Sequence, residues 1–253
     1  MQKNGGDKKR FKVDHFSQDP GDSKIKKYSR LFVGREGWLP LLKYELIVLL
    51  ASWIPGAIGL FLRSKLYPLI LGSVGRNVVF GCHVTFRYPS KIRIGSNSII
   101  DDNCLLDAKG ENNVGITIGD DVYIGRNTIL SCKDGDIELR DHVNIGFNCE
   151  IFSSGKVVLE DYALLAAYCY VIGGGNYDHR LTGLPISQQP LMNAKGIVIG
   201  KNSWLGARAT VLDGSRIGDD SIIGACSLVG SDIPPRSIAV GTPARVSKER
   251  PTA

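Results

Sequence analysis

The stretch that decides the fold is residues 199–229, which read IGKNSWLGARATVLDGSRIGDDSIIGACSLV. An aliphatic residue returns at every sixth position, giving Ile199, Leu205, Val211, Ile217, Ile223 and Val229. A period of six fits neither a helix of 3.6 residues per turn nor an alternating strand. Short fixed periods indicate stacked repeats, and a hexapeptide repeat is typical of a parallel β-helix.

The same period extends back toward residue 74. A turn-forming residue, often Gly, follows each aliphatic residue. A small side chain then stands three positions after this turn-forming residue. One large and one small inward position per hexad fill a triangular prism, with three hexads to a coil. We therefore predict an all-β solenoid, with Cys104, Cys149 and Cys169 as small packing residues. The earlier aliphatic positions are Ile94, Ile100, Leu106, Ile118, Ile124, Leu130, Leu139, Ile145, Ile151, Leu159, Leu165 and Val171.

Composition divides the chain into three regions. Residues 1–35 hold ten Lys or Arg and four Asp or Glu, and form a basic tail that we expect to be partly disordered. Residues 36–73 are strongly apolar, and residues 74–253 carry the repeats. Outside the tail the charges balance at 21 of each sign. The body of the protein therefore has no basic excess to bind nucleic acid.

The apolar region suggests an attachment to a membrane. No charged residue occurs from Leu46 to Leu62, which is at the short limit for crossing a ~30 Å hydrocarbon core. Pro55-Gly56 interrupts the run, so we expect two short helices. A helix that crosses the bilayer would put the basic tail and the repeats on opposite sides of the membrane. A positively charged segment favours the cytosolic side. We predict re-entrant or interfacial attachment to an anionic membrane, with a helical cap on the open end of the β-helix as the alternative.

The expected location is the cytoplasm, peripheral to the inner face of the cytoplasmic membrane. The first apolar run begins only after about 37 polar-leaning residues, which does not resemble a signal peptide. The six cysteines include no CxxC pair and fit no zinc spacing, so we expect free thiols and no metal.

The repeat breaks most strongly between Val171 and Ile199, which lie 28 positions apart. Solenoids direct insertions outward, often onto the binding face. This excursion contains His179, and an imidazole with a pKa near ~6.5 can remove a proton from a hydroxyl at neutral pH. His179 is therefore the candidate general base. His83 and His142 occupy outward positions where polar residues are unremarkable.

Four C-terminal segments resemble those of a known family. Residues 199–207 are similar to IGxxxWIGA, and residues 224–229 to GAGSVV. Residues 232–235 match DIPP, and residues 241–246 match GxPA[KR]V. Together they resemble the hexapeptide-repeat acyltransferases, which are left-handed parallel β-helices. The resemblance covers roughly residues 74–250 and is closest to maltose/galactoside, xenobiotic and polysaccharide O-acetyltransferases.

The resemblance implies a homotrimer with active sites between neighbouring subunits and acetyl-CoA as co-substrate. His179 corresponds to the loop histidine of the family. Arg245 and Lys248 match basic positions near the CoA phosphates. The pantetheine arm is expected along the backbone near Trp204, Gly206, Ala207, Ala225 and Ser227.

Two positions depart from the family pattern. Gly230-Ser231 replaces a Thr-Lys pair, so one CoA-phosphate contact is not expected. Gly146 stands where galactoside enzymes place an acceptor-binding Asn, which leaves nearby Asn148 as the substrate candidate. The predicted activity is O-acetylation of a saccharide or lipid-linked sugar for a surface polysaccharide or glycolipid. The alternatives are N-acetylation of an amino sugar, a zinc lyase of the γ-carbonic-anhydrase type, which needs three converging histidines, and a non-catalytic scaffold.

Overall fold

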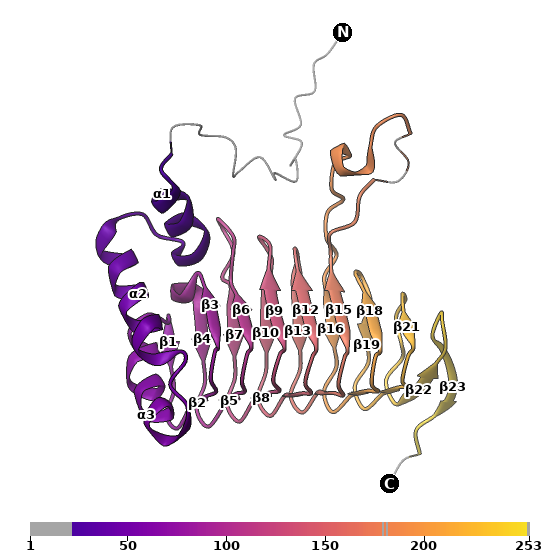
Figure 1. Ribbon diagram of the computed structural model, residues 1–253. Helices are drawn as coiled ribbons and strands as arrows, with labels where there is room; N and C mark the ends of the chain where they lie inside the picture. The colour runs from indigo at the N-terminus through magenta and orange to yellow at the C-terminus, as the bar shows by residue number, and fades with distance from the viewer. Residues whose placement is uncertain (1–21, 179, 181, 252–253) are drawn as a thin grey trace.

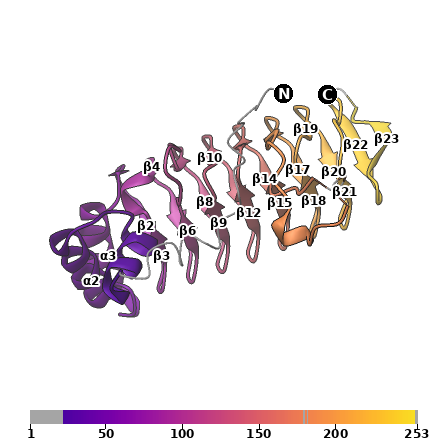
Figure 2. The ribbon, with the colours of Figure 1, turned by 90° about the horizontal axis from the view of Figure 1, so that it is seen from above.

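The computed structural model describes residues 22–178, 180 and 182–251. Most of this chain winds into a left-handed parallel β-helix, which confirms the predicted solenoid and its short helical N-terminal segment. Helices lie across one end of the solenoid and a β-hairpin lies at the other (Figures 1 and 2).

Successive strands pass in turn through three flat sheets, which we call A, B and C. Sheet A contains β1 (Ser73–Val74), β4 (Ile92–Ile94), β7 (Ile116–Ile118), β10 (Asp136–Leu139), β13 (Lys156–Leu159), β16 (Ile197–Ile199) and β19 (Arg216–Ile217). Sheet B contains β2 (Val79–Phe80), β5 (Ile99–Ile100), β8 (Tyr123–Ile124), β11 (Asn144–Ile145), β14 (Leu164–Leu165), β17 (Trp204–Leu205), β20 (Ile222–Ile223), β22 (Ser237–Val240) and β23 (Arg245–Glu249). Sheet C contains β3 (Thr85–Arg87), β6 (Leu105–Asp107), β9 (Ile129–Cys132), β12 (Glu150–Ser153), β15 (Tyr170–Gly173), β18 (Thr210–Leu212) and β21 (Leu228–Val229).

The core consists of columns of equivalent side chains, one from each coil. Parallel pairing keeps the hexads in register, so that Ile145 pairs with Ile124 on one side and Leu165 on the other. The predicted cysteines fill the small inward position, and burial raises the pKa of the Cys104 thiol to about 12. Such a thiol stays protonated and packs as a small apolar group. Buried members of the small column are Cys104, Thr128, Cys149, Cys169, Ala209 and Ser227.

The corners between sheets repeat one backbone device. The third residue of each corner turn adopts a positive φ, a conformation that Asn and Asp tolerate better than most side chains. His142 is on this position at the corner between sheets A and B, and His83 at the corner between B and C. Their rings therefore belong to different edges of the prism. The other A/B members are Asn77, Asn97, Asp121, Tyr162, Asn202, Asp220 and Arg236, and the other B/C members are Asn103, Asn127, Asn148, Tyr168, Arg208 and Cys226.

The N-terminal segment covers the first coil. The chain breaks between α2 and α3 at Pro55, and Arg63 of α3 is buried beneath the break. No helix among the described residues combines the length and apolar character needed to cross a bilayer. The helical elements are α1 (Lys24–Tyr28), the π-helix η2 (Ser29–Val33), α2 (Trp38–Ala51), α3 (Gly56–Leu66) and the 3₁₀ turns η3 (Tyr67–Leu69), η4 (Pro89–Lys91) and η5 (Ile186–Gln188).

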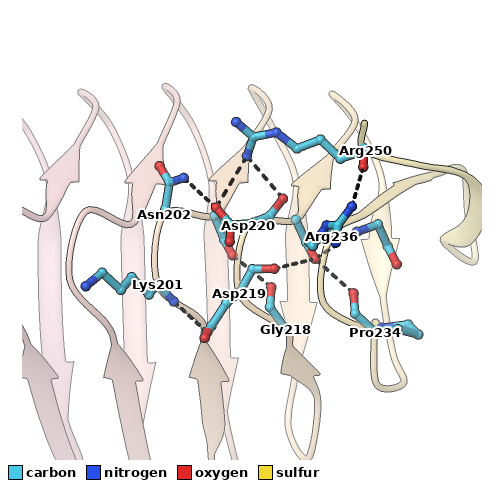
Figure 3. A network of polar contacts seen from close by, with 11 residues as sticks. Lys201, Asn202, Gly218, Asp219, Asp220, Pro234, Arg236 and Arg250 are labelled. Atoms are coloured by element: carbon cyan, nitrogen blue, oxygen red, sulfur yellow. Dashed lines mark hydrogen bonds and ion pairs between the residues drawn. The ribbon is translucent and has the colours of Figure 1, made fainter. Parts of the chain in front are cut away.

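The C-terminal hairpin is fixed to the last coils by a polar network on the A/B corner (Figure 3). The Arg250 guanidinium donates to the Asp220 carbonyl at 3.1 Å, and its backbone N–H donates to the Arg236 carbonyl at 2.7 Å. The Asn202 amide donates to the Asp220 carboxylate at 2.6 Å. Because β23 precedes Arg250 directly, this network sets the position of the hairpin strand.

Candidate active site

The first part of the candidate site is the excursion, whose described residues project from the corner between sheets C and A (Figure 1). Its two legs pair with each other, so that it leaves the solenoid as a stalk made of residues 174–178 and 190–196. Tyr177 forms an antiparallel bridge with Leu191, and the Asp178 N–H donates to the Pro190 carbonyl at 3.1 Å. The outer end of the excursion is therefore carried by a hydrogen-bonded base.

Asp213 of the following coil ties both legs of this stalk down. Its carboxylate accepts from the backbone N–H groups of Lys195, at 3.0 Å, and Gly196, at 2.8 Å. It also accepts from the Asn176 side-chain amide at 3.5 Å. Two glycines start the outgoing leg, and Gly174 has a φ of +118° with no room for a Cβ beside the Ser154 hydroxyl. Asp213 directly follows β18 at the start of the next corner from sheet C to sheet A, and its role as an anchor was not identified from the sequence.

His179, the predicted general base, lies outside the described residues. The residues on either side of it are described, and they form a close ion pair. Arg180 donates to both carboxylate oxygens of Asp178, at 2.8 and 3.0 Å. This hydrogen bonding raises the pKa of Arg180, so its positive charge is fixed beside position 179. This ion pair was not predicted from the sequence as part of the site.

The second part of the candidate site is a ridge of small residues on the corner between sheets B and C. The ridge contains the predicted pantetheine residues Gly206, Ala207 and Ala225. Coils stack so closely here that a Cβ on Gly206 would lie 2.6 Å from the Ala225 nitrogen. The ridge residues carry no side chain larger than a methyl group, so their backbone is open to an extended amide-bearing ligand. The full ridge is Ala166, Ala167, Gly206, Ala207, Gly224 and Ala225.

The remaining predicted cofactor residues are arranged around this ridge. Trp204 lies beside it on sheet B with an exposed indole, 47% accessible. Arg245 and Lys248 are exposed on β23, which is three strands from β17 in the order β17-β20-β22-β23 and thus about 14 Å away. Ser227 is different, because its hydroxyl is buried and accepts from the Gly241 N–H at 3.0 Å. Only the backbone of Ser227 is suited to contact a ligand outside the prism.

Asn148 lies on the same B/C corner as the ridge, two coils before Ala207. It has a φ of +54°, and its N–H donates to the Arg126 carbonyl at 2.9 Å. Beside it the Phe147 ring makes an edge-to-face contact with Tyr168, with 5.7 Å between ring centroids. Asn148 and the ridge thus share an edge, whereas the stalk leaves from the other edge of sheet C.

The histidines in the described part of the chain do not converge. The His142 ring stacks on Tyr162 with 4.5 Å between centroids, and His83 is on a different corner. Among the described residues, no group of three or more His, Cys, Asp or Glu side chains is arranged to hold a metal ion. His83 and His142 therefore give the zinc-lyase alternative no geometric support.

Comparison with known proteins gives the family. Residues 196–231 match the model described as bacterial transferase hexapeptide (six repeats), and residues 93–132 match the hexapeptide repeat of succinyl-transferase. The chain is 32% identical to the galactoside O-acetyltransferase of Escherichia coli K12 over 74% of its own length and 68% of the relative's. It belongs to the hexapeptide-repeat acetyltransferase superfamily.

The chain is also similar to two other proteins, which it covers to different extents. The chain is 33% identical to the probable acetyltransferase Rv3034c of Mycobacterium tuberculosis over 53% of its own length, but it spans only 44% of that protein. The crystal structure of AntD, an N-acyltransferase from Bacillus cereus in complex with dTDP and 3-hydroxybutyryl-CoA, superposes with a TM-score of 0.53 at 22% identity. That match covers 79% of this chain and 91% of AntD, and it supports the fold alone.

Proposed function

We propose that this protein transfers an acetyl group from acetyl-CoA to a hydroxyl of a saccharide or lipid-linked sugar. The observation that carries the proposal is that one chain of this acetyltransferase family has both a ridge of small residues and an anchored stalk, which His179 follows directly in the sequence. The ridge suits the pantetheine arm, and Arg245 and Lys248 supply cations for the CoA phosphates. A surface polysaccharide or glycolipid is the proposed destination of the acetyl group.

In the proposed reaction His179 accepts the proton of the acceptor hydroxyl while the hydroxyl oxygen attacks the thioester carbonyl. The tetrahedral intermediate collapses, the C–S bond breaks, and the CoA thiolate takes the proton from the imidazolium. No covalent acyl-enzyme is required. General-base assistance of this kind contributes about 10²–10⁴ in rate. Asp178 and Arg180 flank position 179 in the sequence, and their charges are paired with each other.

The proposal includes assembly into a homotrimer whose sites lie between subunits. Two observations support this arrangement. The ridge and the stalk are on opposite edges of sheet C, whose strands are two to four residues long. Large apolar side chains are also exposed on both sides of the ridge, as expected of a surface that another subunit covers. These side chains are Phe147, Leu164, Tyr168, Tyr170 and Trp204.

The test is transfer of labelled acetyl from acetyl-CoA into a membrane glycolipid extract and into soluble saccharides. We expect wild-type protein to label an acceptor and His179→Ala to lose at least about a hundredfold in rate. His142→Ala is the matched control, because it removes an exposed histidine from another corner of the same solenoid. Equal rates for wild type and His179→Ala would remove the general base from the proposal.

The product separates O-acetylation from N-acetylation of an amino sugar. Mild alkali removes an acetyl ester from a sugar hydroxyl but leaves an acetamide intact. We expect the label to be released by mild alkali. Retained label would show that the acceptor group is an amine. Absence of both acetyl transfer and acetyl-CoA binding would favour the scaffold alternative.

A further inference from the structure

The surface at the N-terminal end of the solenoid is the largest feature that the proposed activity does not explain. Helices α2 and α3 cover the end of the β-helix with one side and leave the other side open (Figures 1 and 2). We name the exposed apolar side chains of these helices and their connection the apolar end face. Its members are Trp38, Leu39, Leu42, Leu46, Leu49, Leu50, Trp53, Ile58, Leu60 and Phe61.

The inner side of this segment is firmly attached to the first coil. The Tyr44 hydroxyl donates to the Phe86 carbonyl at 2.8 Å, and the buried Arg63 guanidinium donates to the Phe80 carbonyl at 2.8 Å. Tyr67 packs edge-to-face with Phe80 and Phe86, with centroids 5.3 and 5.0 Å apart. These contacts place the helices against the open end of the first coil, in the position of the helical cap that was the alternative to membrane attachment.

The outer side is far more apolar than a cap requires. In α2 only Tyr44, Ile47 and Ala51 are buried, although every residue of the helix other than Lys43, Tyr44 and Glu45 is apolar. Leu49 is 64% exposed and Ile58 is 71% exposed. The exposed side of a helix normally carries polar residues, and a largely apolar helix is normally buried in protein or in lipid. In the described part of the chain these side chains stay exposed, so a covering partner is expected.

The charges around the end face favour lipid over a second copy of the chain. Lys43 and Lys65 are exposed on its two helices, and residues 22–35, which precede them, contain five Lys or Arg and one Asp. Two nearby carboxylates are engaged within the same segment, because Glu45 accepts from the Tyr28 hydroxyl at 2.7 Å and Glu36 pairs with Arg30 at 3.4 Å. A cationic border attracts anionic headgroups and repels another copy of itself.

The aromatic residues and the dimensions match attachment at the surface of a bilayer. Trp38 begins α2 and Trp53 follows its end, which places an indole at both ends of the apolar helix. Tryptophan is enriched at the interface between headgroups and acyl chains. The 14 residues of α2 span about 21 Å, which suits a helix lying in the interface.

We propose that the apolar end face inserts into the surface of an anionic lipid bilayer. The β-helix then stands on the membrane by its N-terminal end, with its axis directed away from the lipid, since α2 and α3 lie across that end (Figure 1). This attachment is independent of the proposed acetyl transfer. If the acceptor is a lipid-linked sugar, it also holds the enzyme at the surface where that acceptor lies.

The test is co-sedimentation of the full-length protein with vesicles of phosphatidylcholine alone or mixed with phosphatidylglycerol. We expect binding to the mixed vesicles to be at least about tenfold tighter, and to weaken as sodium chloride is raised. Brominated lipids should quench tryptophan fluorescence on binding, because Trp38 and Trp53 enter the interface. Failure of wild-type protein to bind the mixed vesicles overturns the proposal.

A variant with a matched control distinguishes insertion of the end face from nonspecific adsorption to vesicles. Leu49→Glu with Ile58→Glu places two carboxylates on the end face and should reduce vesicle binding at least about tenfold. Both side chains are exposed, so the fold is retained. Val114→Glu is the control, since Val114 is 57% exposed but lies on a loop between sheets C and A, and its binding should be unchanged.

Light scattering on the same proteins tests the second-copy alternative. If the double variant lowers the oligomer mass while vesicle binding stays at the wild-type level, another copy covers the end face and the lipid proposal fails. Unchanged oligomer mass together with lost vesicle binding is the result we expect. Acetyl transfer to a soluble acceptor should be the same for wild type and double variant, so this result is independent of the catalytic proposal.

Discussion

At the scale of single residues, Arg63 joins the helical segment to the solenoid. Its buried guanidinium donates to the carbonyls of Phe80, Ala51 and Ile54, at 2.8, 3.2 and 2.7 Å. Two of these carbonyls are at the end of α2 and at the break before α3, where a helix terminus leaves acceptors without intrahelical partners. One cation thus holds the break, the end of α2 and the first coil together.

Replacing Arg63 by Met should destabilise the N-terminal end of the molecule. The side chain keeps most of its volume, but three acceptors lose their donor, two of them buried, and an unsatisfied buried acceptor costs about 1–3 kcal/mol. We expect the free energy of unfolding, measured in urea, to fall by about 3 kcal/mol or more. Lys65→Met, an exposed change in the same helix, is the control. A loss no larger than that of the control would show that water replaces the guanidinium.

Single positions also show where sequence reasoning reaches its limit. The small inward column was predictable, because one residue in every six must fit the narrow part of the prism, and Cys104, Cys149 and Cys169 are buried as expected. The role of Asp213 was not predictable, because its carboxylate binds backbone N–H groups that are 17 and 18 residues away in the chain. Only the stacking of one coil on the next brings them together.

At the scale of elements, the stalk is the device that positions the excursion. An equivalent corner three coils earlier uses the same chemistry without the long excursion. There Asp136 accepts from the N–H groups of Val114 and Gly115, at 2.7 and 2.8 Å. The two aspartates therefore make the same kind of backbone contact, and only Asp213 also holds a segment proposed to carry the catalytic histidine.

Asp213→Ala and Asp136→Ala form a matched pair. Both should lower stability by a similar amount, about 1–2 kcal/mol for two lost backbone contacts. We expect only Asp213→Ala to lower kcat, by about tenfold to a hundredfold, because displacement of a catalytic group by about 1 Å has effects of that size. The measurement is steady-state kinetics with thermal unfolding of both variants. Equal kcat values for the two variants would mean that the stalk keeps its position without Asp213.

The C-terminal hairpin is the element that carries the proposed CoA-phosphate cations. Arg250→Ala removes the guanidinium that holds the hairpin to the Asp220 carbonyl (Figure 3). We expect the KM for acetyl-CoA to rise about threefold to tenfold with kcat unchanged. This pattern is expected when a lost interaction stabilised the bound substrate and the transition state equally. Arg140→Ala is the control, since Arg140 is ion-paired to Glu138 at 2.8 Å in the middle of the solenoid. A change in kcat alone would place the effect of Arg250 outside acetyl-CoA binding.

At the scale of the whole molecule, the sequence predicted the solenoid because every coil obeys the same packing rule. It also predicted the helical segment, whose apolar run breaks at Pro55. The separation of the site was not visible in the sequence. Ridge and stalk are adjacent in the chain through β15 (Tyr170–Gly173), which joins Ala167 to Gly174, yet this strand places them on opposite edges of sheet C. In the trimer that we propose, a complete site combines the stalk of one subunit with the ridge of its neighbour.

Mixing two inactive proteins tests this arrangement directly. His179→Ala lacks the proposed base, and Ala207→Trp places a large side chain on the exposed ridge where the pantetheine arm is expected. If each site takes its histidine from one subunit and its ridge from the next, randomly mixed trimers regain about one quarter of the wild-type sites, because each half is intact with a probability of one half. The measurement is acetyl transfer after joint refolding or co-expression, with each variant alone as the control. Activity that stays at the level of the separate variants would place both halves of the site within one chain.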